Sequence, residues 1–278
     1  MNTELEKKRD FLLDVYARQP LRLHRGIPVF SEGSEYTQNY ERISEDHLVC
    51  HRKDGTNPFI PKDLWVQMEH STIELIKKHS LPGHMILDVG VGLGRLLSHF
   101  ADRRRYGMDI SFGYLESAQG KGIEVCYALA EEMPYRESIF DLVVCTDVLE
   151  HVLNLNLCIE NILFVLKANG ILVVRVPYRE NLAGYLTTPY KYVHLRNFDE
   201  YSIRLLFERI YNCEHLETTF ASYFFKEAFL RYRLPPVRLN FVVSKIIACA
   251  GLIWPTVALR MREKLYYPLE MNVVYRKK

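Results

Sequence analysis

An α/β fold built on a mostly parallel sheet is predicted by two features of this 278-residue sequence. Short apolar segments alternate with segments of helical spacing through the middle of the chain, and one of the apolar segments runs into a glycine-rich turn. Continuous apolar strands between helices need cover on both faces of their sheet, so we expect a doubly wound, Rossmann-like arrangement. The expected strands are residues 85–89, 105–109, 124–129, 140–146 and 171–176.

The glycine-rich turn follows the first of these strands, in ILDVGVGLGRLL (residues 86–97). The strand ends in Asp88, and the chain then passes through Gly90, Gly92 and Gly94 into a helix expected to begin near Arg95. Glycines at the carboxyl edge of an open α/β sheet let a ligand approach the bare backbone. A dinucleotide fingerprint would need G-x-G-x-x-G, and Arg95 occupies the place of its third glycine.

A carboxylate is expected at the tip of the second strand. Asp109, in YGMDIS, follows Asp88 by 21 residues, and it can accept hydrogen bonds from both hydroxyls of a ribose. The alternative is that Asp109 only caps the following helix. A third segment, ALAEEMPYRESIFDLVVCTDVLEHV (residues 128–152), combines an acidic loop, a buried strand and the sequence LEHV.

Together these motifs resemble class I S-adenosylmethionine-dependent methyltransferases of the ubiquinone/menaquinone type, over residues 64–178. The resemblance implies a seven-stranded sheet whose last strand is antiparallel, with S-adenosylmethionine as the cofactor. It also implies that the loop at Ala130 and Glu131 reads the adenine and that residues 145–148 line the methionine part. Many relatives carry an aspartate where this chain has Leu129. The implied cofactor-binding residues are Asp88, Gly90, Gly92, Gly94, Asp109, Ala130, Glu131, Cys145 and Thr146.

The composition limits the class of partners. With 48% hydrophobic and 25% charged residues, the chain is large enough for one sizeable core. Its 36 basic residues nearly balance 34 acidic ones, so we expect no nucleic-acid partner bound mainly through phosphates. The start, MNTELEKKRD, lacks the apolar core of a signal peptide, and we expect a cytoplasmic protein. The six cysteines form no C-x-x-C pair, which favours a reducing compartment and no metal ion.

Two segments lie outside the expected core. Residues 1–60 are expected to form a short amphipathic helix over residues 3–18, stopped by Pro20, and a lid in which Tyr36 and Tyr40 fold over the cofactor. Residues 61–278 are expected to form the methyltransferase domain. Residues 213–225 and 269–278 fit the sixth and seventh strands, with an insertion at about 226–267 between them. We expect residues 241–259 to form an apolar helical hairpin over the acceptor site, bent near Pro255.

The apolar run 246–259 has 14 residues, too few to span a bilayer. Basic residues flank it, so residues 238–264 are expected either to meet anionic lipid at the inner face of a membrane or to pack on the core as a lid or dimer contact.

The expected reaction is methyl transfer to an oxygen or nitrogen atom of a small-molecule, lipid-linked or glycan-linked acceptor. His151, expected at a helix start, and His194, after the fifth strand, are the candidate catalytic residues, because imidazole can accept a proton near neutral pH. Each could instead be a histidine satisfied by local hydrogen bonds. The alternatives are C-methylation of a quinone-like acceptor, a non-catalytic S-adenosylmethionine-binding scaffold and, against the glycine spacing, an NAD-dependent oxidoreductase.

Overall fold

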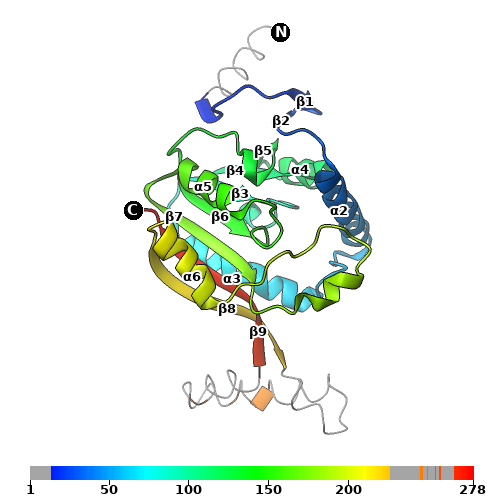
Figure 1. Cartoon of the computed structure of the whole chain (residues 1–278), viewed down its shortest axis with the longest axis vertical. Coiled ribbons are helices and arrows are strands. Elements are labelled where there is room, and N and C mark those ends of the chain that lie inside the picture. Colours follow the sequence, from blue (N-terminus) through cyan, green and yellow to red (C-terminus); the bar gives the residue numbers. More distant parts are fainter. Residues whose placement is uncertain (1–13, 226–244, 247–248, 250–253, 255–256, 258–265) are drawn as a thin grey trace.

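Nine strands of the described residues form one mixed sheet in the computed structural model, which describes residues 14–225, 245–246, 249, 254, 257 and 266–278. The strand order is β1-β2-β5-β4-β3-β6-β7-β9-β8 (Figure 1). Five central strands run parallel, and β9 pairs antiparallel with both β7 and β8. The strands are β1 (Arg22–His24), β2 (Ile27–Val29), β3 (Met85–Val89), β4 (Arg104–Asp109), β5 (Glu124–Tyr127), β6 (Phe140–Thr146), β7 (Leu166–Pro177), β8 (Glu214–Phe225) and β9 (Tyr266–Arg276).

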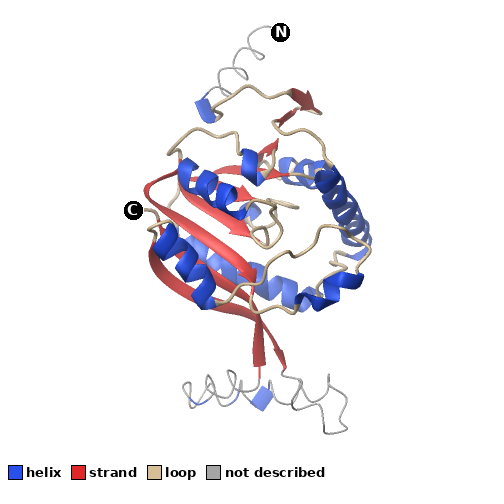
Figure 2. Ribbon diagram, in the orientation of Figure 1, coloured by secondary structure: helices blue, strands red, loops and turns tan. Residues whose placement is uncertain are grey.

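Helices cover both faces of this sheet (Figure 2). Successive residues of a strand point to opposite faces, and in β3 Leu87 belongs to one buried cluster while Ile86 belongs to the other. The first cluster packs under α5 and α6, and the second packs under α3 and α4. This double cover explains why the central strands are apolar throughout. The helices are α2 (Glu35–Asp54), α3 (Lys62–His79), α4 (Phe112–Gln119), α5 (Leu155–Val165) and α6 (Glu200–Arg204).

The predicted fold class is therefore confirmed, including the antiparallel last strand. The sheet has nine strands rather than the expected seven, because the β1–β2 hairpin adds two short strands at its edge. Strands 85–89 and 140–146 have the predicted bounds, whereas β7 begins five residues before the predicted Ile171. Asn169 lies within β7 and has the left-handed backbone that its side chain tolerates, with φ of 61°.

The helix expected to begin near Arg95 is not formed. Only a short 3-10 helix, Leu97–His99, follows the glycine turn. Gly94 still has a left-handed backbone, with φ of 71°, and β4 already begins at Arg104. Because β3 and β4 are parallel, the chain must return from the carboxyl end of β3 to the amino end of β4 within these few residues. This leaves room for a single helical turn.

The N-terminal segment contributes to the sheet as well as to the cavity described below. β1 and β2 form a hairpin that joins the edge of the sheet, where Val29 pairs in parallel with Tyr127 of β5. α2 then packs along α4 (Figure 1). The predicted helix over residues 3–18 lies mostly outside the described residues, and the described part leaves helical geometry at Tyr16, before Pro20.

The predicted hairpin over residues 241–259 also lies outside the described residues. Its two flanking strands are well defined, because β8 and β9 pair with each other as far as Phe225 and Tyr266. Their ends project beyond the rest of the sheet (Figure 1). None of the helices in the described part of the chain is long and apolar enough to cross a bilayer.

Candidate active site

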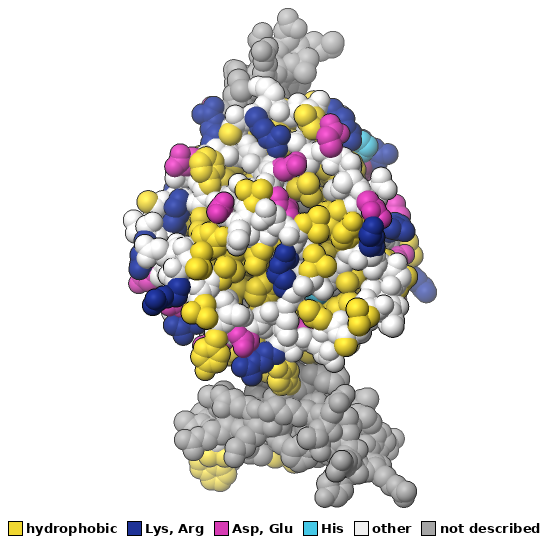
Figure 3. All heavy atoms as spheres, viewed as in Figure 1, with side chains coloured by type: hydrophobic (Ala, Val, Ile, Leu, Met, Phe, Trp, Pro, Cys, Tyr) yellow, Lys and Arg dark blue, Asp and Glu magenta, His cyan; other side chains and the backbone are white. Residues whose placement is uncertain are grey.

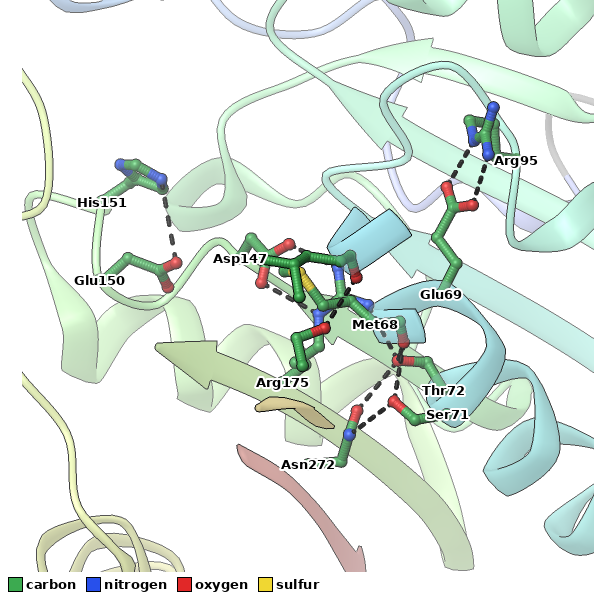
Figure 4. Close-up of polar contacts among 12 residues, drawn as sticks. Met68, Glu69, Ser71, Thr72, Arg95, Asp147, Glu150, His151, Arg175 and Asn272 are labelled. Carbon is green, nitrogen blue, oxygen red and sulfur yellow. Dashed lines mark hydrogen bonds and ion pairs between the residues drawn. The ribbon is translucent and has the colours of Figure 1, made fainter. Parts of the chain in front are cut away.

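A cavity of about 470 Å³ opens at the carboxyl ends of the parallel strands. The ends of β3, β4, β6 and β7 form its floor, α2 and α3 contribute one wall, and the segment 178–198 between β7 and α6 contributes another. Figure 4 shows part of this region: Arg175 of β7 is turned toward Asp147, which follows β6, and Asn272 of β9 is turned toward Ser71 and Thr72 of α3. The cavity therefore lies where open α/β sheets bind their ligands.

The three glycines of the turn have different environments. All three have left-handed backbones, with φ of 76° at Gly90, 50° at Gly92 and 71° at Gly94. A Cβ atom would lie 2.4 Å from Val148 Cγ2 if built on Gly90, and 2.9 Å from the Cα atom of Ala118 if built on Gly94. A Cβ atom on Gly92 would meet no protein atom within 4 Å. Gly90 and Gly92 line the cavity, whereas Gly94 lies outside its lining and keeps the turn packed on α4.

Asp109 lies at the tip of β4 and lines the cavity, as the spacing predicts. One carboxylate oxygen accepts the N–H of Gly92 at 2.9 Å, and the other accepts those of Ile110 and Ser111 at 2.8 and 3.0 Å. Burial raises the pKa of Asp109 to about 6, against the lowering effect of these three donors. Ser111, not Asp109, caps α4, so the helix-cap alternative is wrong. The oxygen that accepts the N–H of Gly92 has a further lone pair for a ribose hydroxyl, whereas both lone pairs of the other oxygen are engaged.

The cavity is rich in carboxyl groups. Asp88, at the end of β3, is buried, and its Oδ1 atom has no hydrogen-bond partner among the described residues. Burial raises the pKa of Asp88 well above its ordinary value, although the Arg175 guanidinium opposes the shift. A cation bound here would be attracted to these groups. The acidic residues that line the cavity are Glu69, Asp88, Asp109, Glu131, Asp147, Glu150 and Glu270, and the basic ones, apart from histidines, are Arg95 and Arg175.

The loop after β5 also borders the cavity. Ala130 and Glu131 lie in a short 3-10 helix and line it, as does Leu129. The Oε1 atom of Glu131 accepts the N–H groups of Leu153 and Asn154 at 2.9 and 3.1 Å. This carboxylate therefore holds the loop before α5, and an adenine would meet mainly the backbone of Leu129 and Ala130.

The residues that follow β6 differ from the expectation in two respects. Cys145 is completely buried in the core and does not line the cavity, whereas Thr146 does. Burial is also the main cause that raises the pKa of the Cys145 thiol. His151 lies in a turn, and α5 begins only at Leu155, so the histidine is not at a helix start.

Arg175 organises the floor of the cavity (Figure 4). Its guanidinium donates to both oxygens of Asp147, at 3.1 and 2.5 Å, and to the hydroxyl of Thr72 at 2.9 Å. The hydroxyl of Thr72 lies 2.9 Å from the side-chain oxygen of Asn272 in β9. Arg175 was not predicted as a site residue, although a charged residue within the apolar run ILVVRVP is a signal that could have indicated one.

The two predicted histidines meet in the cavity, with ring centroids 4.5 Å apart. The hydroxyl of Tyr40, from α2, lies 2.8 Å from Nδ1 of His151. Nδ1 of His194 is hydrogen-bonded to the carboxylate of Glu180, and the Tyr185 hydroxyl lies 3.1 Å away. Burial, and secondly His194, lower the pKa of His151 to about 3, so its ring is neutral at physiological pH.

Tyr36 and Tyr40 line the cavity, as the lid hypothesis expects. Tyr185 and Glu270 also line the cavity, and the Tyr185 hydroxyl donates to Glu180 behind it. No local sequence pattern groups these residues with the two tyrosines, because they converge only through the tertiary structure.

Comparison with known proteins identifies the kind of domain that contains this cavity. Residues 87–174 match a family model described as a methyltransferase domain. Over 114 residues the chain is 33% identical to an uncharacterized protein of Methanocaldococcus jannaschii, covering 41% of this chain and 54% of that protein. Over 101 residues it is 36% identical to the tRNA (carboxymethyluridine(34)-5-O)-methyltransferase of Arabidopsis thaliana, covering 35% of this chain and 25% of that enzyme. The chain thus spans about half the length, or less, of these curated relatives.

Among solved structures, magnesium protoporphyrin IX methyltransferase from Synechocystis PCC 6803, with bound SAH, has a similar fold. The TM-score is 0.56 at 16% sequence identity, and the match covers 87% of this chain and 98% of that one. Residues 87–174 are thus similar to methyltransferase domains, and the fold resembles that of a methyltransferase solved with bound SAH.

Proposed function

We propose that the protein transfers a methyl group from S-adenosylmethionine to an oxygen or nitrogen atom of an acceptor that binds beside His151 and His194. The observation that carries this proposal is that the two imidazoles share one cavity with the glycine turn and Asp109. Cofactor residues and proton-accepting residues are thus within one enclosed space. This arrangement also favours catalysis over the scaffold alternative, which needs no such histidines.

The cavity fits S-adenosylmethionine in shape and charge. The open space above Gly92 admits the cofactor close to the backbone, and the remaining lone pair of Asp109 Oδ2 suits a ribose hydroxyl. The buried Oδ1 atom of Asp88, which has no partner among the described residues, suits the amino group of its methionine part. The surplus of carboxyl groups stabilises a positively charged sulfonium. In the proposed role of the adenine loop, Leu129 and Ala130 flank the base, with Thr146 at the methionine end.

S-adenosylmethionine supplies a methyl group on a sulfonium, so the residues of this chain need only position the acceptor and remove its proton. The Glu180 carboxylate accepts a hydrogen bond, so Nδ1 of His194 carries the proton and its Nε2 has a free lone pair. Nε2 of His194 takes the acceptor proton while the acceptor atom bonds to the methyl carbon. With a pKa near 3, His151 is a poor proton acceptor and positions the acceptor instead.

The proposed acceptor is a small or lipid-linked molecule. Opposite the polar floor, the cavity is lined by Ile43, Phe59, Ile60, Trp65 and Met68, which suit an apolar acceptor body. Basic and acidic side chains are interspersed on the face shown in Figure 3, which does not favour a nucleic-acid backbone. The similarity to the tRNA methyltransferase covers a quarter of that enzyme, and it supports the domain rather than the acceptor.

The test uses S-adenosylmethionine with a labelled methyl group and the small-molecule and lipid fractions of a cell extract. We expect His194→Ala to lower the rate of label transfer at least about tenfold, because general-base catalysis usually contributes 10² or more. His151→Ala should also lower it, whereas His79→Gln, far from the cavity on α3, should not. Unchanged transfer by both cavity variants would contradict the assignment of the two histidines.

A further inference from the structure

Glu150 has an environment that the proposed methyl transfer does not explain. Its side chain is completely buried, and neither of its carboxylate oxygens has a hydrogen-bond partner among the described residues. Nε2 of His151 lies 3.9 Å from its Oε1 atom (Figure 4). An ionised carboxylate without partners is strongly destabilising when buried, so such a group holds a proton, is paired with another group or binds a metal ion.

Both neighbouring histidines are oriented by groups behind them. The Tyr40 hydroxyl lies at hydrogen-bonding distance from Nδ1 of His151, and Glu180 and Tyr185 surround Nδ1 of His194. With Nδ1 engaged, Nε2 is the nitrogen that each ring can offer to a ligand. Histidines that bind metal ions typically have their other nitrogen held in this way, often by a carboxylate.

The three groups are close enough to share one ion. One ligand atom from each of Glu150, His151 and His194 lies within 4.8 Å of the other two. Glu150 and His151 come from the turn after β6, and His194 comes from the segment after β7, so the tertiary fold brings them together. The cysteine spacing excludes a zinc module of cysteine pairs, but it does not bear on a site of this kind.

The surrounding charge favours a cation as well. The charges of Asp147 and Glu180 act on Glu150, and Glu270 also lies close enough to interact with it. The guanidinium near these groups is that of Arg175. Both oxygens of Asp147 are already engaged by Arg175. The carboxyl groups here outnumber the guanidinium group, and a divalent ion is attracted to such a site.

We propose that Glu150, His151 and His194 bind a divalent first-row transition-metal ion, such as Mn²⁺, Fe²⁺, Co²⁺ or Zn²⁺. Two imidazoles and one carboxylate favour these ions over Mg²⁺ or Ca²⁺, which prefer oxygen ligands alone. Three protein ligands leave coordination positions open toward the cavity, where an acceptor can bind.

The site specifies the acceptor class of the proposed methyltransferase, and this part rests on the proposed function. An acceptor hydroxyl bound to the ion loses its proton near neutral pH, because the ion stabilises the negative oxygen. The proton passes to water, the oxygen bonds to the methyl carbon, and the electron pair of the broken carbon–sulfur bond stays on sulfur. When the ion is bound, the Nε2 lone pair of His194 binds the ion and cannot accept the acceptor proton. The ion, instead of His194, then promotes loss of that proton. The acceptor is therefore a hydroxyl compound.

The first test is titration of the intact, metal-stripped protein with Co²⁺ alone, followed by visible absorption and calorimetry. We expect one bound ion per chain, with the absorption of a site that contains nitrogen and oxygen ligands. Glu150→Gln should weaken binding at least about tenfold, and Tyr40→Phe or Glu180→Gln by about 10- to 100-fold. The matched control is His79→Gln, which removes another histidine that contacts a carboxylate, with His79 Nε2 2.6 Å from Glu217.

Thermal unfolding shows whether the variants are folded. We expect Glu150→Gln to unfold cooperatively with a Tm that no longer rises when Co²⁺ is added, whereas the Tm of the parent protein does rise. No saturable Co²⁺ binding, or equal binding by the parent and Glu150→Gln, would overturn the proposed site.

The second test separates this inference from the proposed function. Chelation should abolish transfer of the labelled methyl group, and Co²⁺ or Mn²⁺ should restore it, while binding of S-adenosylmethionine is unchanged. If transfer continues in protein shown to be free of metal, the proposed role of the metal ion is wrong, and the methyltransferase proposal stands. If S-adenosylmethionine itself does not bind, the proposed function fails, whatever the result with Co²⁺.

Discussion

Asp109 connects the local backbone of the cofactor turn to the proposed ribose site. Its carboxylate holds the N–H of Gly92 and the start of the loop before α4, and it still borders the cavity. A single side chain thus shapes the turn and offers acceptors to a ligand, so its loss should affect binding more than most surface changes would.

We predict that Asp109→Ala lowers the affinity for S-adenosylmethionine by at least about tenfold, because hydrogen bonds to a charged group are worth roughly 1.5–3 kcal/mol. Isothermal titration calorimetry measures this affinity. The control is Asp102→Ala, which removes an exposed carboxylate that pairs with Arg103. An affinity within about twofold of the parent value would show that the ribose assignment is wrong.

The raised pKa of Asp109 gives a second prediction, on the pH dependence of cofactor binding. Burial raises this pKa to about 6, so the carboxyl is ionised at pH 7.5 and becomes largely protonated as the pH falls through 6. Protonation removes an acceptor for the ribose, and the affinity for S-adenosylmethionine should therefore fall between pH 7.5 and 5. In Asp109→Asn this part of the dependence should disappear. If the affinity changed with pH equally in the parent protein and in Asp109→Asn, another group would be the cause of the pH dependence.

At the scale of elements, the glycine turn combines two requirements that substitutions can separate. Gly94 must approach Ala118 of α4, whereas Gly92 faces open space beside the cavity. Both have left-handed backbones, so an alanine at either position is strained by about 1–2 kcal/mol.

We predict that Gly94→Ala lowers Tm more than Gly92→Ala does, because the added methyl group also overlaps the α4 backbone, at a further cost of about 1–3 kcal/mol. Gly92→Ala should instead have the larger effect on affinity for S-adenosylmethionine, since its methyl group projects toward the ligand. Gly33→Ala, with open space and no left-handed backbone, is the control. The opposite order of effects would mean that the roles of the two glycines are exchanged.

The elements that the sequence predicts well are those with continuous apolar strands. Buried parallel strands such as 85–89 and 140–146 have few polar residues, and a polar or glycine-rich turn follows each of them, so their ends are well defined. β1 and β2 have three residues each, too few for any periodicity, and they were not predicted. The prediction of a helix near Arg95 was wrong, because the length of that helix depends on where β4 begins. The start of β4 is set by the tertiary structure.

The residues of the site also fall into a predictable group and an unpredictable one. Asp88, Gly92 and Asp109 lie at successive strand ends, so their spacing along the chain predicts that they meet at one edge of the sheet. Tyr40, Tyr185 and Glu270 reach the cavity from α2, from the segment after β7 and from β9. No local pattern connects them, and only the packed structure brings them near the histidines.

At the scale of the whole molecule, the insertion between β8 and β9 remains the part with the strongest sequence signal for a membrane surface. Its structure lies outside the described residues, but its flanking strands project beyond the body of the sheet (Figure 1). A lipid-linked acceptor would explain both the basic, apolar composition of residues 238–264 and the apolar wall of the cavity.

We predict salt-sensitive co-sedimentation of the intact chain with vesicles that contain anionic lipid. Arg260→Glu together with Arg262→Glu should reduce it, because each basic residue near the surface contributes about 1 kcal/mol. Neutral vesicles are the control. If neither protein binds at low or high salt, the membrane-facing hypothesis is wrong, and the buried-lid or dimer-contact alternative is favoured.

The central claim is that the cavity at the carboxyl ends of the parallel strands binds S-adenosylmethionine. The most direct measurement is isothermal titration of the intact protein with S-adenosylmethionine and, separately, with NAD. The fold, the glycine turn and the carboxyl-rich cavity predict saturable binding of one S-adenosylmethionine per chain and no measurable binding of NAD. Binding of NAD without binding of S-adenosylmethionine, or of neither ligand, would contradict the claim.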